Sequence, residues 1–340
     1  MKIHLLSAGG EASPRQTCHG RLPLKAECTL ALQCVAAAAV SRPERMGPID
    51  MPLTLPLSRK DLLPKRKCDR SLFIVMLVCV PGVFIFDVCY VLPRVLHECR
   101  ISPYMHVLFA LFILLNVGVN MTRLLQSKPA ARDLPPSTLP NVLLPNWFYC
   151  HDCHLNVPPR SYHCRACNEC ILKQDHHCMF AGKCIGFANQ RYFVVGVAYV
   201  MLGACYSLYF HLNWIIETLL GGYRWPLLLS QMAPHLGWLF GAFDGYGFLA
   251  ACLNLFEVCV AVFCFTLLYS QGVCIMNNQT MHERRRDVKK FVHASLVENI
   301  RDVFGDRWLL VWIWPFVDSP PKGDGVNFET YPEVEERKYL

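Results

Sequence analysis

A cluster of cysteine and histidine residues between positions 150 and 184 holds the side chains with the clearest potential for chemistry. Seven of the chain's nineteen cysteines fall in this segment. Two cysteines separated by two residues supply two thiolates from one tight turn, and zinc takes four tetrahedral sulfur or nitrogen ligands. The segment therefore predicts zinc binding, and its potential ligands are Cys150, Cys153, His163, Cys164, Cys167, Cys170, His177, Cys178 and Cys184.

These nine potential ligands are one more than two closed zinc sites can use, so one thiol is left for another task. Spacing alone does not decide how the ligands are divided between two ions, because several pairings satisfy four-coordination. The alternative is a set of buried cysteines without metal. It fits a hydrophilic segment rich in proline poorly.

The rest of the chain is strongly apolar. Of its 340 residues, 53% are hydrophobic and only 17% are charged, whereas an ordinary soluble domain has about 25% charged residues. Four stretches, 71–93, 103–125, 192–216 and 247–275, each supply the roughly 20 residues that a membrane-spanning helix needs. We therefore predict an all-α membrane protein with four transmembrane helices. A cysteine-rich double-zinc domain, residues 147–193, lies between the second and the third.

The distribution of lysine and arginine predicts the orientation. Basic residues gather before the first span, from Lys60 to Arg70, after the fourth, from Arg284 to Lys290, and within the cysteine-rich segment. By the positive-inside rule, both termini and the cysteine-rich domain are cytoplasmic. The cytoplasm is reducing, which favours zinc thiolates over disulfides. The net charge of +7 is thus explained by the orientation of the chain in the membrane. It does not indicate nucleic-acid binding, and we predict no nucleic-acid partner.

The two ends of the chain carry weaker signals. Residues 1–56 are predicted to be disordered. Residues 276–340 form a cytoplasmic C-terminal region in which apolar side chains recur at helical spacing from Val288 to Phe304, and this pattern predicts an amphipathic helix. Asp87 and Glu257 are acidic residues inside the first and fourth spans. We attribute them to a polar lumenal cavity or to closeness to the membrane interface.

The order of residues resembles the DHHC cysteine-rich domain, which is the signature of the eukaryotic protein palmitoyltransferases. The similarity rests on the cysteine pairs, on Pro-Arg-Ser-Tyr-His-Cys at 159–164 and on Asp-His-His-Cys at 175–178. It extends to the four spans and to Thr-Met-His-Glu at 280–283, and it covers about residues 70–320. Met179 and Phe180 replace the family's usual Pro-Trp, so the chain resembles a divergent member.

This resemblance implies a protein S-acyltransferase. Cys178 would carry the acyl group, His176 would take up its proton, and Asp175 would orient His176. The acyl donor would be palmitoyl-CoA or another long-chain acyl-CoA, the acceptors cysteines of membrane-associated proteins, and the location an endomembrane, the ER or the Golgi. The resemblance also implies two structural zinc ions, one held by Cys150, Cys153, His163 and Cys170, and the other by Cys164, Cys167, His177 and Cys184.

The alternative function is a non-catalytic membrane zinc scaffold derived from the same family, and acylation of Cys178 distinguishes the two. A zinc module for ubiquitin transfer or nucleic acid is disfavoured, because the chain has neither RING-like ligand order nor C2H2 spacing. A transporter is disfavoured because the spans show no internal symmetry.

Overall fold

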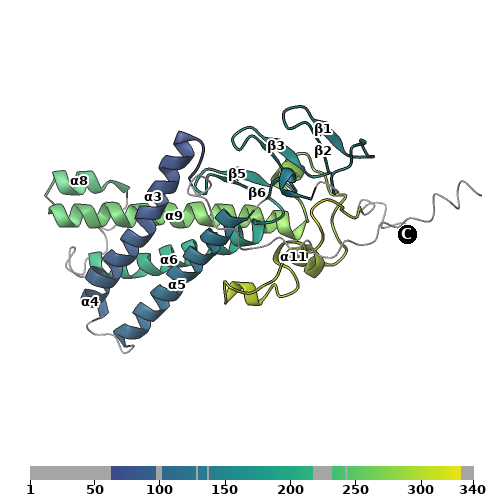
Figure 1. Ribbon diagram of the computed structural model, residues 1–340. Helices are drawn as coiled ribbons and strands as arrows, with labels where there is room; N and C mark the ends of the chain where they lie inside the picture. Colours follow the sequence, from purple (N-terminus) through teal and green to yellow (C-terminus); the bar gives the residue numbers. More distant parts are fainter. Residues whose placement is uncertain are drawn as a thin grey trace, which may run out of the picture. The chain divides into compact units, whose positions relative to one another are not determined.

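The computed structural model describes residues 63–96, 102–127, 129–135, 138–216, 232–241 and 244–330 (Figure 1). Four helices in it are long and apolar enough to cross a membrane. The first is α3 (Lys67–Phe86), which continues through the π-helical segment η1 (Asp87–Val91) into α4 (Leu92–Val95). The others are α5 (Pro103–Gln126), α6 (Gln190–Trp214) and α9 (Gly245–Met276). The predicted four-helix membrane fold is confirmed.

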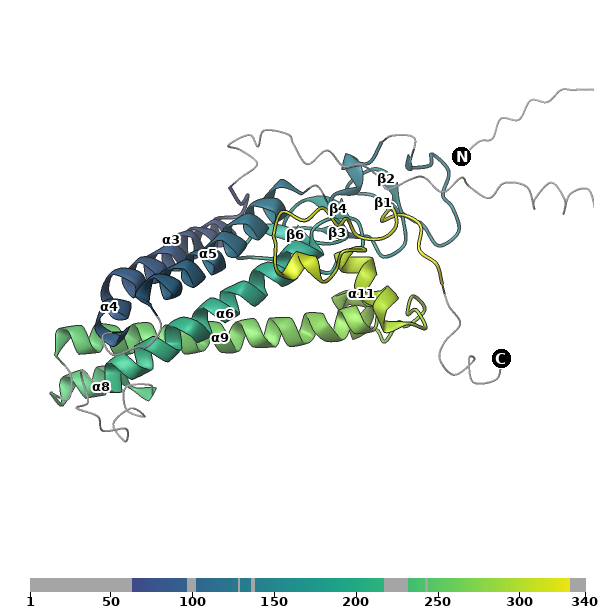
Figure 2. The ribbon, with the colours of Figure 1, turned by 90° about the horizontal axis from the view of Figure 1, so that it is seen from below.

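The long helices are apolar on their outer faces as well as their inner ones. Val78, Leu108 and Phe265 are among many large apolar side chains that point outward and are exposed, as expected for helices surrounded by lipid. Helix α6 packs against both α5 and α9 (Figure 2). Gly203 permits the close approach of α5 and α6, because a side-chain carbon at this position would lie 3.2 Å from Ile113.

The cysteine-rich region folds into three antiparallel hairpins of two short strands each (Figure 1). They are β1 (Phe148–Cys150) with β2 (Leu155–Val157), β3 (Tyr162–Cys164) with β4 (Glu169–Ile171), and β5 (His176–Cys178) with β6 (Lys183–Ile185). The described part of the chain is mostly helical, as predicted, but the sequence does not predict these strands. The region is tied to the end of α5, because Lys183 Nζ donates to the carbonyl of Ser127 and the Leu172 amide donates to that of Pro129.

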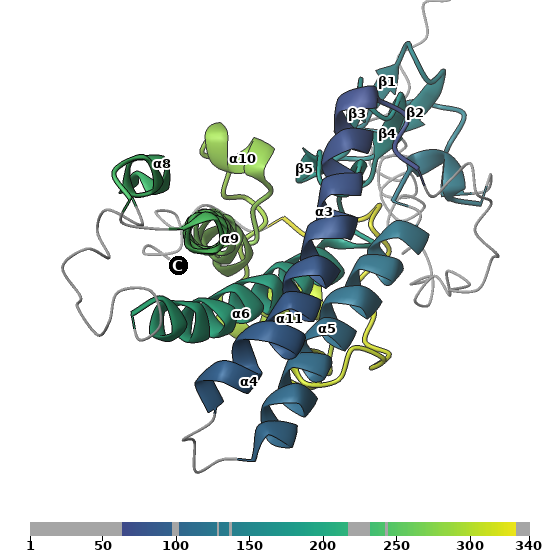
Figure 3. The ribbon, with the colours of Figure 1, turned by 90° about the vertical axis from the view of Figure 1, so that its left-hand side faces the viewer.

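Two short helices follow α9, namely α10 (Met281–Arg285) and α11 (Leu296–Phe304) (Figure 3). The predicted amphipathic helix is wrong for its first half, since 288–295 is not helical and only α11 carries the apolar stripe. Asp287, at a φ of +51°, breaks the helical path after α10. The remaining short elements are η3 (Ala131–Asp133), α8 (Pro234–Leu239) and η6 (Leu310–Trp312). Residues 1–56, predicted to be disordered, lie outside the described residues.

Candidate functional site

Two groups of one histidine and three cysteines each converge in the hairpin region. His163 Nδ1 lies 3.6, 3.3 and 3.9 Å from the sulfurs of Cys150, Cys153 and Cys170. In the second group, His177 Nδ1 lies 3.7, 3.4 and 3.6 Å from the sulfurs of Cys164, Cys167 and Cys184. Zinc bonds of about 2.3 Å to sulfur and 2.0–2.1 Å to nitrogen separate tetrahedral ligands by about 3.6 Å. Both groups therefore fit a zinc ion.

The hairpin register explains why the two groups interleave. Neighbouring residues on a strand point to opposite faces, so His163 and Cys164 on β3 belong to different groups. His163 is paired across the hairpin with Cys170, and His177 is paired with Cys184. Each group thus combines a cross-strand histidine–cysteine pair with a Cys-x-x-Cys turn from the preceding hairpin.

The second group has a further partner from the membrane domain. Asp69, on the first turn of α3, is 2% exposed, and its Oδ2 lies 3.0 Å from Nε2 of His177. A carboxylate on the outer nitrogen of a ligating histidine fixes the tautomer and directs the other nitrogen to the metal. This contact spans 108 residues, and no local sequence signal marks Asp69 for it.

Cys178 belongs to neither group and lies beside an aspartate–histidine pair. Oδ2 of Asp175 lies 2.7 Å from Nδ1 of His176, which leaves Nε2 as the second nitrogen of the ring. Burial lowers the pKa of His176, but the hydrogen bond to Asp175 and the contact with the Cys178 thiol outweigh it and bring the pKa to about 9. Near neutral pH the ring is therefore mainly the imidazolium, which stabilises a negative charge on a neighbouring group.

Asp175 accepts hydrogen bonds from the C-terminal half of the fourth span and from the segment that follows it. It is 1% exposed, and it accepts hydrogen bonds from Gln271 Nε2 at 2.6 Å and from the Met281 amide at 2.9 Å. Sequence reasoning missed Gln271, because a glutamine in an apolar helix has many structural uses. These donors satisfy the buried carboxylate and fix its orientation toward His176.

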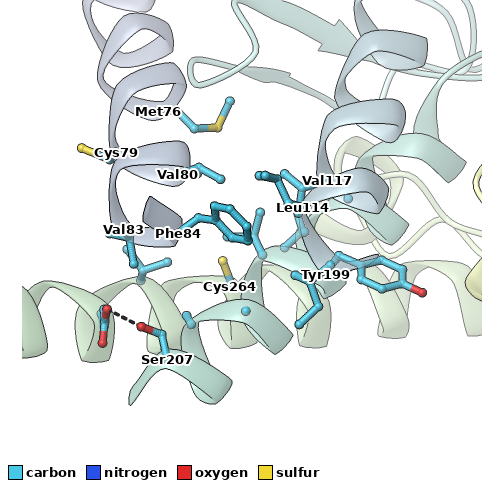
Figure 4. Close-up of a pocket in the computed structure, with 18 of the residues that line it drawn as sticks. Met76, Cys79, Val80, Val83, Phe84, Leu114, Val117, Tyr199, Ser207 and Cys264 are labelled. Atoms are coloured by element: carbon cyan, nitrogen blue, oxygen red, sulfur yellow. Dashed lines mark hydrogen bonds between the residues drawn. The ribbon is translucent and has the colours of Figure 1, made fainter. Parts of the chain in front are cut away.

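The Cys178 side chain also lines an apolar cavity of about 440 Å³ (Figure 4). Its wall consists mainly of aliphatic and aromatic side chains from α3, α5, α6 and α9, among them Val80 and Val117. Phe180 closes part of the same wall and packs against Phe263 with ring centroids 5.5 Å apart. The Cys178 thiol therefore faces an apolar space between the helices.

Comparison with known proteins agrees with this geometry. A family model described as DHHC palmitoyltransferase matches residues 145–288. The chain is 34% identical to the probable palmitoyltransferase ZDHHC24 of Rattus norvegicus over 230 residues, which is 66% of this chain and 78% of the relative. It is 33% identical to the Homo sapiens protein of that name over 227 residues, with the same two shares. The Danio rerio protein of that name is 29% identical over 236 residues, 69% of this chain and 78% of the relative.

The chain belongs to the DHHC palmitoyltransferase family. It is accordingly a multi-pass membrane acyltransferase, a protein S-palmitoyltransferase, with a cysteine-rich region that can hold zinc. Its departure from the family's Pro-Trp has a structural account. Phe180 keeps an aromatic ring in the cavity wall, while Met179 is 50% exposed.

A buried ion pair fixes the cysteine-rich region of this DHHC protein to the segment after α9. The Arg160 guanidinium donates two hydrogen bonds of 2.8 Å to the Glu283 carboxylate. Thr280 and Glu283 form a reciprocal capping box that starts α10. The motif at 280–283 thus serves as an anchor for Arg160, a role that sequence spacing does not indicate.

Two basic residues near the site are buried. Arg191 is 7% exposed and donates to the Ser319 carbonyl, and Lys173 is 5% exposed. Burial lowers the pKa of Lys173 to about 8. Neither side chain is therefore accessible to the phosphates of a bound ligand, whereas Arg285, Arg286 and Lys290 are exposed.

Proposed function

We propose that the enzyme transfers a long-chain acyl group from acyl-CoA to Cys178 and then to cysteines of membrane-associated proteins. One observation carries the proposal. Cys178 is the only cysteine of 150–184 outside both zinc-type groups, and it lies between the Asp175–His176 pair and the apolar cavity. A nucleophile, a base and a space for the acyl chain thus meet at one atom.

The first half-reaction would begin with transfer of the Cys178 proton to Nε2 of His176. The thiolate then attacks the thioester carbonyl, the new carbon–sulfur bond forms, and the bond to the CoA sulfur breaks. His176 returns the proton to the departing CoA thiolate. In the second half-reaction, a substrate cysteine loses its proton to His176 and attacks the acyl-enzyme. The proton then passes to Cys178 as it leaves. Asp175 stabilises the imidazolium in both steps.

The cavity supports a long acyl chain as the group transferred. Burial of each CH2 contributes about 0.8 kcal/mol, so a sixteen-carbon chain strongly favours the apolar space between the helices over water. The exposed basic residues after α10 could contact the CoA phosphates, because α10 is joined to Asp175 through the Met281 amide. Palmitoyl-CoA has both a long acyl chain that fits the cavity and phosphates that the basic residues can bind.

Two zinc ions would have a structural role. The assigned ligands are Cys150, Cys153, His163 and Cys170 for one ion and Cys164, Cys167, His177 and Cys184 for the other. The short hairpins bury little apolar surface, so metal binding would supply much of their folding free energy. Zinc at His177 would also fix the backbone next to His176 and Cys178.

The orientation proposed from the charges places both termini and the cysteine-rich region in the cytoplasm, in an ER or Golgi membrane. Acyl-CoA and the cysteines of cytoplasmic-face proteins are then on the same side of the membrane as Cys178. Exposure of Met179 next to the nucleophile supports an approach of substrate proteins from that side.

Acyl-enzyme formation tests this proposal. Purified protein is incubated with labelled palmitoyl-CoA, and the hydroxylamine-sensitive label is measured beside zinc content. Cys178→Ser should keep two zinc ions and lose the label. His176→Ala should keep zinc but form acyl-enzyme about 10²–10⁴-fold more slowly, as for loss of a general base. His177→Ala should lose one zinc. Folded wild type with two zinc ions and no label would support the zinc scaffold instead.

A further inference from the structure

A second group of polar side chains lies deep between the helices, away from Cys178. It consists of Asp87 at the start of η1, Ser207 and His211 on α6, and Glu257 on α9. His211 and Glu257 are 2% and 3% exposed. Both side chains therefore lie inside the helix bundle and not on its outer surface. Asp69 marks the zinc end of α3, and Asp87 follows it by 18 residues, or about 27 Å of helix.

The contacts within this group are short and involve every member. Ser207 Oγ lies 2.5 Å from Oδ2 of Asp87 and 2.7 Å from Oε1 of Glu257. Nδ1 of His211 lies 2.8 Å from Oε2 of Glu257. Nε2 of His211 lies 2.9 Å from Oδ1 of Asp87. Figure 4 shows Ser207 at the wall of the cavity, with a dashed line that marks a hydrogen bond of its hydroxyl.

The contact between His211 and Asp87 differs from the others. Nε2 of His211 and Oδ1 of Asp87 face each other at 2.9 Å, within ion-pair distance, but neither buried atom makes a hydrogen bond among the described residues. The hydrogen bond to Glu257 places a proton on Nδ1, so in the neutral ring Nε2 presents a lone pair. Two lone pairs at this distance repel each other unless a proton or a metal ion lies between them.

Ser207 also provides too few hydrogens for the two carboxylates that it contacts. Its single hydroxyl hydrogen can be donated to only one of the two carboxylates it contacts. With both carboxylates ionised, the group carries two negative charges between apolar membrane-spanning helices. Such charge in a membrane is costly unless it is neutralised.

We propose that this group binds a divalent first-row transition-metal ion, such as Zn²⁺. Nε2 of His211 and Oδ1 of Asp87 are the inner ligands. At bond lengths of about 2.1 Å their separation corresponds to an angle of roughly 90° at the metal, which suits a five- or six-coordinate ion. Glu257 orients His211 through Nδ1 and supplies the second negative charge. Water in the adjoining cavity, which Asp87, Ser207 and Glu257 line, takes the remaining positions.

The backbone around Asp87 supports a site rather than a chance contact. Asp87 begins a five-residue π-helical segment inside the first span, and π-helical turns in long helices are rare and frequent at functional positions. The three groups that define the site come from three different helices, and their ligand atoms lie within 4.8 Å of one another. An ion here would join the first, third and fourth spans.

Metal content of the purified full chain tests this proposal independently of acyl transfer. The protein is equilibrated with micromolar Zn²⁺, desalted and analysed by mass spectrometry. Wild type should retain three zinc ions per chain, one for each group. His211→Gln and Asp87→Asn should retain two. The matched control is His106→Gln, because His106 is also a histidine within a span but contacts Tyr206 and not the cluster; it should retain three.

X-ray absorption at the zinc edge of wild type keeps the test decisive if the cluster variants fail to fold. The two cysteine groups give three sulfur ligands per zinc, and a third ion held by nitrogen and oxygen lowers the average to two. Two zinc ions in wild type would overturn the proposal. They would mean that protons alone neutralise the charge of the cluster. A third zinc that persists in both cluster variants, or one with sulfur ligands, would overturn it as well. Neither result would affect the acyl-enzyme assay.

Discussion

Loss of the Glu283 charge should destabilise the enzyme strongly. Glu283→Gln removes the negative partner of the Arg160 guanidinium, and the two side chains are 4% and 1% exposed. The stranded guanidinium keeps its charge, because arginine does not deprotonate in proteins. Removing one partner of a buried ion pair costs about 3–5 kcal/mol. At about 2–4 °C per kcal/mol, the unfolding midpoint should fall by roughly 6–20 °C.

The assay is thermal unfolding of purified protein in detergent, followed by intrinsic fluorescence. Glu298→Gln is the control, because Glu298 also pairs with an arginine, Arg301, but the pair is partly exposed at 30% and 39%. The control should change the midpoint little, since solvent screens such pairs. The double variant Arg160→Met, Glu283→Gln removes the stranded charge and should be more stable than Glu283→Gln.

Two results would refute this reasoning. Equal midpoints for Glu283→Gln and Glu298→Gln would mean that the buried pair does not hold the cysteine-rich region against the segment after α9. A double variant less stable than Glu283→Gln would mean that the loss comes from missing packing and not from an unpaired charge.

Three further predictions concern zinc and topology. His163→Ala should lower the zinc content by one ion per chain and expose the hairpins to protease, because structural zinc contributes folding free energy; unchanged zinc content would exclude the assigned ligand. Asp69→Asn should weaken zinc binding about 10–100-fold in competition with a chelator, since it removes the carboxylate on His177, and equal affinities would leave Asp69 a packing role only. Asn278, in a glycosylation sequence, should carry no glycan in cells, because it is 5% exposed and donates to Asp302; a glycosidase-sensitive mass shift abolished by Asn278→Gln would contradict the cytoplasmic orientation.

The sequence was informative where the signal is local. Hydropathy over about 20 residues marks a spanning helix without any knowledge of its neighbours. The cysteine and histidine spacing likewise marks zinc binding, since each Cys-x-x-Cys turn is formed within one hairpin. The division of ligands into two groups needs the register of His163 with Cys170 and of His177 with Cys184, and only the family resemblance supplied it in advance.

The contacts that hold the site together were not predictable in this way. Asp69, Gln271 and Glu283 reach their partners across 108, 96 and 123 residues, and each is an ordinary polar residue in its own segment. The sequence shows the acidic residues inside the spans, but it does not indicate their link through His211. The role of a lone histidine in an apolar helix can be inferred only when the packing of α3, α6 and α9 is known.

The support of Asp175 by Gln271 and the Met281 amide has a consequence for the synthesis of the enzyme. The ribosome completes Cys178 and its two neighbouring histidines well before it reaches Gln271, which lies 96 residues after Asp175. Until the fourth span is inserted, the carboxylate lacks two of its donors and His176 lacks a fixed orientation. If Cys178 carries the acyl group as we propose, a partly made chain can form its cysteine-rich hairpins before the support of Asp175 is complete. Acylation of Cys178 would then require the finished fourth span.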